Sequence, residues 1–500
     1  MPGIPANITI AGRTPATIKG RVAPLIDTAE AARGGFRAGD DTGGGGIEPE
    51  TPGEGLTPAQ WRARLARTGP GTTDPSYDFE NLLTYEGAFL VPNRWPSSTN
   101  LKLNAALGFC YHPPEAGGRN GANGSVFVGS PDGIFEAQVP ANLKPTEQNH
   151  LNLDTVTLLQ DWVDVKNKVP NPPTNPENHN IGWIKIIDGK LYCSMYDNYM
   201  PSGSNSENML ICNDATNLAG ATYQGMMHLD GEDKTVNYTI DVPVDKQAAF
   251  GGTHLSGICA SISIIGRSSF GHSLLAWNPS QINPEDVFVP STTWTYYSGD
   301  TAIQGFSQSN TNIVRHYESV LGVPSLKTFV DSDPSTRINT FDGLALPDED
   351  ERLHLVSWDT KSNCGFFVPG TDTIAFIGWN SGMRFGIGYK NKTIEYGNTK
   401  SDSAGSDPYS AFDFDTVIWT MNANDVLNRT LPGDTQYSSF NLLNDPWSTN
   451  WGTELEGGDH KARLGSFDPT TNKLYLVHRK YPWSKYSSQW VVAVFQVNEV

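Results

Sequence analysis

Residues 181–197 read IGWIKIIDGKLYCSMYD, and this stretch decides the class of fold. Asp188-Gly189, a pair that suits a tight hairpin turn, separates two runs of apolar and aromatic side chains. Residues 125–140, SVFVGSPDGIFEAQVP, repeat the arrangement around Pro131-Asp132-Gly133. Short strands joined by such turns, with almost no helical periodicity, are typical of a β-sandwich, a β-barrel or a β-propeller.

The length of the strand-rich region, residues 76–500, favours the all-β propeller among these three. It exceeds a usual single sandwich, and radial repetition lets an all-β domain grow without long exposed sheet edges. At roughly 60–70 residues per blade, the region would supply six or seven blades. The excess over a compact blade would lie in loops such as 165–180 and 397–410.

The end of the chain predicts how the ring closes. Residues 489–500, QWVVAVFQVNEV, are too apolar for a free end. In a propeller, a terminal strand commonly completes a blade begun by the other end of the domain, which removes the open seam. We predict that this last strand pairs in the same blade as strands near residues 77–112.

Residues 1–75 differ in composition from the rest of the chain. They contain 23 glycines or prolines and two aromatic residues, Phe36 and Trp61. Residues 57–67, TPAQWRARLAR, predict one short helix, with Thr57 as its N-cap. So little apolar material cannot form a core. The segment is therefore either a disordered tail or an extended assembly arm that becomes ordered through contacts with other subunits.

Acidic side chains dominate the charge of the chain. There are 54 Asp and Glu against 35 Lys and Arg, which gives a net charge of −19. No basic run offers a face for nucleic-acid phosphates, so we expect no nucleic-acid partner. No run approaches the ~18 apolar residues of a membrane span, so we expect no membrane insertion. The beginning, MPGIPANITIAG, lacks the basic and apolar regions of a secretory signal, so we expect synthesis in the cytoplasm without export.

The cysteines and histidines show no ligand spacing. The five cysteines are far apart and include no CxxC pair, so we expect neither a zinc site nor a disulfide framework. Cys110 and Cys193 lie in strand patterns, where we expect buried thiols that behave as small apolar groups. His254 and His272 flank an apolar strand and could face a central channel, but our interpretation is that both are hydrogen-bonded or at the surface.

Acidic and glycine-rich segments are the candidates for cation and cofactor sites. Asp331, Asp333 and Ser335 have the first three spacings of a calcium loop, but Pro334 interrupts them and the later ligands are missing, which favours a solvated turn. The loose dinucleotide-loop pattern of the glycines in 382–388 has strand-like flanks, so we reject it. We assign no catalytic, cofactor-binding or metal-ligating residue and expect no cofactor.

The sequence does not identify the catalytic residues that a glycosidase would need. Such an enzyme needs two carboxylates roughly 5–9 Å apart, which different blades would supply across a channel. Several aromatic residues suit contact with sugars or proteins and suit blade packing equally well: Trp294, Tyr296, Tyr297, Trp483 and Tyr486.

Several local motifs occur in an order that resembles a known group of proteins. The motifs are YEGAFLVPN (85–93), LYCSMYDNY (191–199), FGGTHLSGICASISIIGRSSFGHS (250–273), FFVPGTDTIAFIGW (366–379) and GSFDPTTNKLYLV (465–477). The chain thereby resembles a diffuse group of propeller-like, largely uncharacterised proteins of bacteriophages and environmental bacteria. The resemblance implies a propeller over most of residues 77–500 and carries no catalytic assignment.

Together these features lead us to expect a structural component of a phage virion, in the tail, the collar or on the capsid surface. Residues 1–75 would anchor it to other virion proteins or to copies of itself. The propeller would be displayed for binding, with a host-surface glycan or receptor as its partner. Two alternatives stay open: a carbohydrate-active propeller enzyme, such as a glycosidase or a lyase, and a bacterial surface adhesin.

Overall fold

The computed structural model describes fourteen segments of the chain between Leu82 and Glu499. They are residues 82–92, 108–130, 133–147, 152–173, 179–197, 208–229, 236–260, 272–283, 291–295, 361–381, 414–428, 439–442, 462–480 and 489–499. The proposed arm, its short helix at 57–67 and the loop at 397–410 lie outside them. None of the helices in the described segments is long and apolar enough to cross a membrane.

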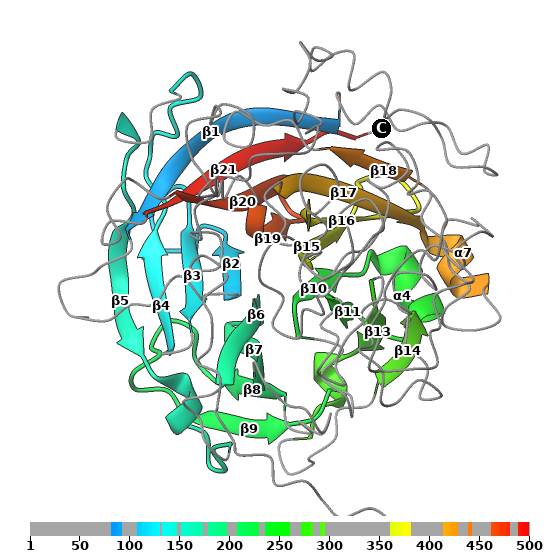
Figure 1. Cartoon of the computed structure of the whole chain (residues 1–500). Helices are drawn as coiled ribbons and strands as arrows, with labels where there is room; N and C mark the ends of the chain where they lie inside the picture. The colour runs from blue at the N-terminus through cyan, green and yellow to red at the C-terminus, as the bar shows by residue number, and fades with distance from the viewer. Residues whose placement is uncertain are drawn as a thin grey trace, which may run out of the picture.

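The described strands form five small antiparallel sheets, which we number as blades 1 to 5 (Figure 1). Blade 1 has the order β1 (Leu83–Pro92), β21 (Gln489–Val497), β20 (Lys473–Lys480), β19 (Ala462–Asp468). Blade 2 consists of β2 (Gly108–His112), β3 (Ser125–Ser130), β4 (Gly133–Gln138) and β5 (Thr157–Val163). Blade 3 consists of β6 (His179–Ile187), β7 (Lys190–Asp197), β8 (Met209–Cys212) and β9 (Tyr223–Met227).

The last two blades are less regular than the first three. Blade 4 contains β10 (Tyr238–Asp241), β11 (His254–Gly257), β13 (Leu274–Trp277) and β14 (Ser291–Thr295). Blade 5 contains β12 (Cys259–Ala260), β15 (Lys361–Phe367), β16 (Thr373–Ser381), β17 (Phe414–Asn422) and β18 (Ser439–Leu442). The helices in the described segments are short: η3 (Val165–Asn167), α4 (Val244–Phe250), η5 (Pro279–Gln281) and α7 (Ala423–Asn428). The expected all-β propeller is thus confirmed as an arrangement of sheets.

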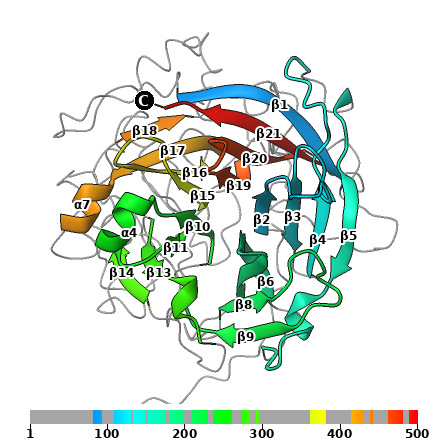
Figure 2. The same cartoon turned by 180° about the vertical axis from the view of Figure 1, so that it is seen from behind.

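The expected number of six or seven blades is wrong, because five blades complete the circle. The innermost strands β2, β6, β10, β15 and β19 each contact the next one around the axis, and β19 contacts β2 again. Figures 1 and 2 show these strands around the centre from both sides. The number of blades is smaller than expected because the connections between strands are longer than the estimate assumed. Residues 296–360, between β14 of blade 4 and β15 of blade 5, are by themselves as many as one expected blade of roughly 60–70 residues.

The last strand closes the ring as its sequence predicts. β21 pairs along its whole length with β1, from Leu83 opposite Val497 to Pro92 opposite Gln489. Beyond the strand, the backbone N–H of Asn498 donates to the carbonyl of Leu82 at 2.8 Å. Three strands from the C-terminal end and one from the beginning of the described chain therefore make up blade 1, and the predicted pairing is confirmed.

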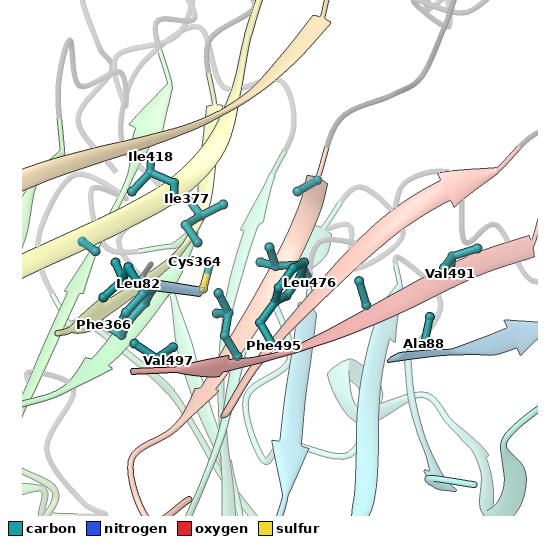
Figure 3. Close-up of a cluster of buried hydrophobic side chains, with 14 of the residues drawn as sticks. Leu82, Ala88, Cys364, Phe366, Ile377, Ile418, Leu476, Val491, Phe495 and Val497 are labelled. Carbon is teal, nitrogen blue, oxygen red and sulfur yellow. The ribbon is translucent and has the colours of Figure 1, made fainter. Parts of the chain in front are cut away.

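The packing between blades uses both faces of β21. Val491, Ala493, Phe495 and Val497 belong to the apolar cluster between blades 1 and 5, part of which Figure 3 shows. The intervening side chains belong to the cluster between blades 1 and 2: Trp490, Val492 and Val494. This alternation follows from the strand period of two residues. The same strand therefore holds two neighbouring blades together.

Glycine permits close approach where blades meet near the axis. A Cβ atom at Gly182 of β6 would overlap the carbonyl oxygen of Val236, which precedes β10. The backbone N–H of the next residue, Trp183, donates to that same carbonyl at 3.1 Å. Blades 3 and 4 are thus joined by main-chain contact beside the axis, and this contact positions the side chains that follow on each strand.

Candidate binding site on the propeller axis

A small cavity lies on the axis, among the five innermost strands. Its lining comes from all five blades: Phe109, Trp183, Ile184, Lys185, Asn237, Tyr238, Thr239, Asp241, Asn363, Cys364, Gly365, Phe366, Gly465, Ser466 and Phe467. About 30 Å³ of it is open to the centres of water-sized groups. Since one water needs roughly 10–15 Å³ on that measure, the enclosed part holds two or three such groups.

Strand β6 aims Lys185 toward blade 4. Its neighbour Ile184 points the other way, because a Cβ atom at Gly108 or Gly129 in blade 2 would meet the Ile184 Cδ1 atom. Alternation along the strand then places Trp183 and Lys185 on the opposite face. Trp183 stacks on Trp277 of blade 4, with ring centroids 5.9 Å apart. Lys185 consequently reaches across the gap between blades 3 and 4.

Strand β10 presents Thr239 and Asp241 on the face that meets β6. The intervening Ile240 points toward blade 5, where a Cβ atom at Gly365 would be 2.6 Å from its Cδ1 atom. Tyr238 points the same way as Ile240, with its ring 5.6 Å from that of Phe376. Two polar side chains of β10 therefore lie on the face toward β6, where Asp241 contacts the ammonium group of Lys185.

An ion pair joins the two strands inside the site. The ammonium of Lys185 donates to Oδ2 of Asp241, and Nε2 of His254 lies 3.3 Å from Oδ1 of the same carboxylate. The other ring nitrogen of His254 is 2.8 Å from the hydroxyl of Thr253. The Lys185 and Asp241 side chains are 17% and 29% exposed, so both are accessible to solvent.

The pKa values of the pair reflect this mutual stabilisation. Burial opposes ionisation of Asp241, but the charge of Lys185 and the contact with His254 outweigh it and hold the pKa of Asp241 below its ordinary value. Burial likewise opposes the charge of Lys185, and Asp241 outweighs it, so the pKa of Lys185 is raised. Both groups are therefore charged at neutral pH, and their charges cancel.

Hydroxyl and amide groups complete the polar part of the lining. The Thr239 hydroxyl oxygen is buried and has no hydrogen-bond partner among the residues that the structure describes. Asn237 donates through Nδ2 to the carbonyl of Ser362 at 3.4 Å, and the Ser466 hydroxyl accepts from the backbone N–H of Tyr111 at 3.0 Å. The cavity thus offers hydrogen-bond donors and acceptors without net charge.

The described lining contains a single carboxylate, Asp241. The pair of opposed carboxylates that a glycosidase uses is not formed by these residues. No group of three or more potential ligands in the described segments could hold a metal ion. The cavity can therefore recognise a polar group by hydrogen bonding, and the described residues show no arrangement for a hydrolytic reaction.

The structure places the histidines and cysteines singled out in the sequence. His254 is held by Asp241 beside the cavity, as expected of a hydrogen-bonded histidine. His272 is fully buried, with its ring stacked on Phe376 at 3.9 Å. All five cysteines are buried free thiols, as expected for Cys110 and Cys193, and burial raises the pKa of each.

The other candidates from the sequence lie where the structure gives no side-chain description. Outside the described residues are Asp331, Asp333, Ser335, Tyr296, Tyr297, Gly382, Gly386, Gly388, Trp483 and Tyr486. Trp294 lies on β14, and its side chain is likewise not described. Sequence reasoning missed Lys185 and Asp241. The available signal was a lone charged residue within an apolar strand, IGWIKII for Lys185 and YTID for Asp241.

No protein-family model matches the chain, and no curated protein matches it.

Acid should remove the stabilisation that Asp241 provides. Its pKa is lower in the folded chain than the ordinary value of about 3.9, so the contribution is complete above that value and is lost as the pH falls further. We expect the difference in unfolding free energy between the natural chain and Lys185→Met/Asp241→Leu to be constant from pH 5 to 8. Below about pH 4, the natural chain should lose stability relative to the double variant. Urea unfolding at each pH measures it, and a difference that is the same at pH 3 and pH 7 would contradict the assignment.

Proposed function

We propose that this protein is a structural component of a phage virion, anchored by residues 1–75 and displaying the five-bladed propeller for binding. One observation carries the proposal. The ring is closed by β1 and β21, so the propeller is complete without the residues that precede Leu82. Those residues are thus available for contacts with other proteins.

The position of β1 supports such an anchor. β1 is the outermost strand of blade 1, farthest from the innermost strand β19. In Figures 1 and 2 it lies on the outside of the ring. A segment attached there can reach neighbouring subunits without crossing the axial cavity. Its partners would be other virion proteins or copies of this chain, and its composition suits a segment that folds on binding.

Deletion of residues 1–75 tests the proposal. All the described strands remain, because β1 begins at Leu83. We expect the shortened chain to stay soluble and to unfold cooperatively, with a melting temperature within about 2 °C of the full chain, since a shift of that size corresponds to about 2 kcal/mol in a domain of this length. We also expect it to be lost from virions, and from any oligomer that the full chain forms.

The measurements are a thermal melt, light scattering after gel filtration, and immunodetection of tagged chains in purified particles. A substitution confined to the propeller surface, Val244→Ser, serves as the control, because the Val244 side chain is 85% exposed. Incorporation of the shortened chain at the level of the control would refute the anchor. Loss of the cooperative melt would instead show that residues 1–75 belong to the core.

A further inference from the structure

The axial cavity carries a hydrogen-bonding pattern that selects one class of ligand. Lys185 of β6 supplies a donor and Asp241 of β10 supplies an acceptor, and the two groups are side by side. Among the described residues, Asp241 takes one of the three N–H donors of Lys185. The carboxylate of Asp241 contacts Lys185 and His254 and has about four acceptor positions, so it too can accept more.

The hydroxyl of Thr239 extends this pattern by one group. Thr239 lines the cavity two residues before Asp241, on the same face of β10. Its oxygen is buried without a hydrogen-bond partner in the described part of the chain. A buried polar group that lacks a partner is destabilising, so a ligand that supplied one would recover that cost.

The charges of the site argue against an ionic ligand. A small anion drawn to Lys185 would meet the carboxylate of Asp241, and a small cation would meet the ammonium group. A neutral group that both donates and accepts would satisfy both partners. The hydroxyl group does so, with one donor and two acceptor lone pairs.

The size of the cavity sets how many hydroxyl groups can enter. Its enclosed part accepts two or three water-sized groups, which matches two neighbouring hydroxyl groups on one edge of a cyclic ligand. The remainder of that ligand would lie in the open mouth of the site. The exposure of Lys185 and Asp241 shows that the pair can be reached from solvent.

We propose that the axial cavity binds the edge of a neutral sugar through two adjacent hydroxyl groups, which donate to Asp241 and accept from Lys185 and Thr239. Glycan recognition would then occur at the centre of the propeller. The inference goes beyond the proposed virion role and does not depend on it, because binding is measured on the isolated full chain.

The test uses the methyl glycosides of glucose, galactose, mannose and N-acetylglucosamine as probes. Saturation-transfer NMR identifies which of them binds to the full chain, and calorimetric titration gives its affinity. We expect saturable binding of at least one glycoside. Thr239→Val should weaken it about 3- to 10-fold, the value of one hydrogen bond, and should leave the melting temperature unchanged or raised. Asp241→Asn should weaken it further.

A second ion pair between blades 4 and 5 supplies the matched control. Lys246 of α4 pairs with Asp372 outside the axial cavity, so Lys246→Met/Asp372→Asn should retain the full affinity. Three results would overturn the proposal: no glycoside binds, Thr239→Val binds as tightly as the natural chain, or only acetate and glucuronate bind, with an affinity that falls as salt is added. The last result would define an anion site at Lys185 instead.

Discussion

A chain truncated after Ser488 is expected to lose cooperative unfolding and to accumulate as insoluble or molten protein. The deletion removes β21, which pairs with β1 on one side and with β20 on the other. It also removes seven buried apolar side chains from two blade interfaces: Trp490, Val491, Val492, Ala493, Val494, Phe495 and Val497. Each large one contributes about 1.5–3 kcal/mol, and their sum is comparable with the ~5–15 kcal/mol that stabilises a whole domain.

Two further deletions, one shorter and one longer, serve as comparisons. Removal of Glu499 and Val500 alone leaves the hydrogen bond from Asn498 to Leu82 in place and should change the melting temperature little. Removal of residues 1–75 should also be tolerated, although it takes away six times as many residues as the twelve of the C-terminal truncation. The measurements are the soluble fraction and the thermal melt. A soluble product truncated after Ser488 with an unchanged melt would show that ring closure does not stabilise the propeller.

Loss of one partner of the axial ion pair is expected to be the most damaging single substitution at the site. Lys185→Met leaves the carboxylate of Asp241 among protein groups, with His254 as its one remaining ion-pair partner in the described segments. Breaking a buried pair in this way costs about 3–5 kcal/mol, and the partial exposure of Asp241 favours the lower end of that range. The double variant Lys185→Met/Asp241→Leu should recover most of the loss, because no uncompensated charge remains.

The pair formed by Lys246 and Asp372 provides the comparison. The carboxylate of Asp372 is 45% exposed, so Lys246→Met should cost no more than about 1 kcal/mol. Urea unfolding of each single and double variant gives the coupling energy of both pairs. Equal losses at Lys185 and Lys246 would mean that the axis does not exclude water enough to strengthen the ion pair.

Local sequence was sufficient for the hairpins and for the strand that closes the ring. The pairing of β6 with β7 places Ile187 opposite Lys190 across Asp188-Gly189, as the turn residues of 181–197 predict. The apolar alternation of 489–497 likewise predicted a buried strand, and both of its faces are indeed covered. These features depend on side-chain periodicity and turn chemistry, which neighbouring residues determine.

The number of blades and the axial site were decided only by the tertiary structure. Blade number depends on how the innermost strands meet around the axis, and the long stretches between strands conceal it from an estimate based on residues per blade. Lys185 and Asp241 are 56 positions apart and belong to different blades. Each by itself is one charged residue in a strand. Their partnership exists because β6 and β10 are adjacent in the ring, and that adjacency is a property of the closed circle.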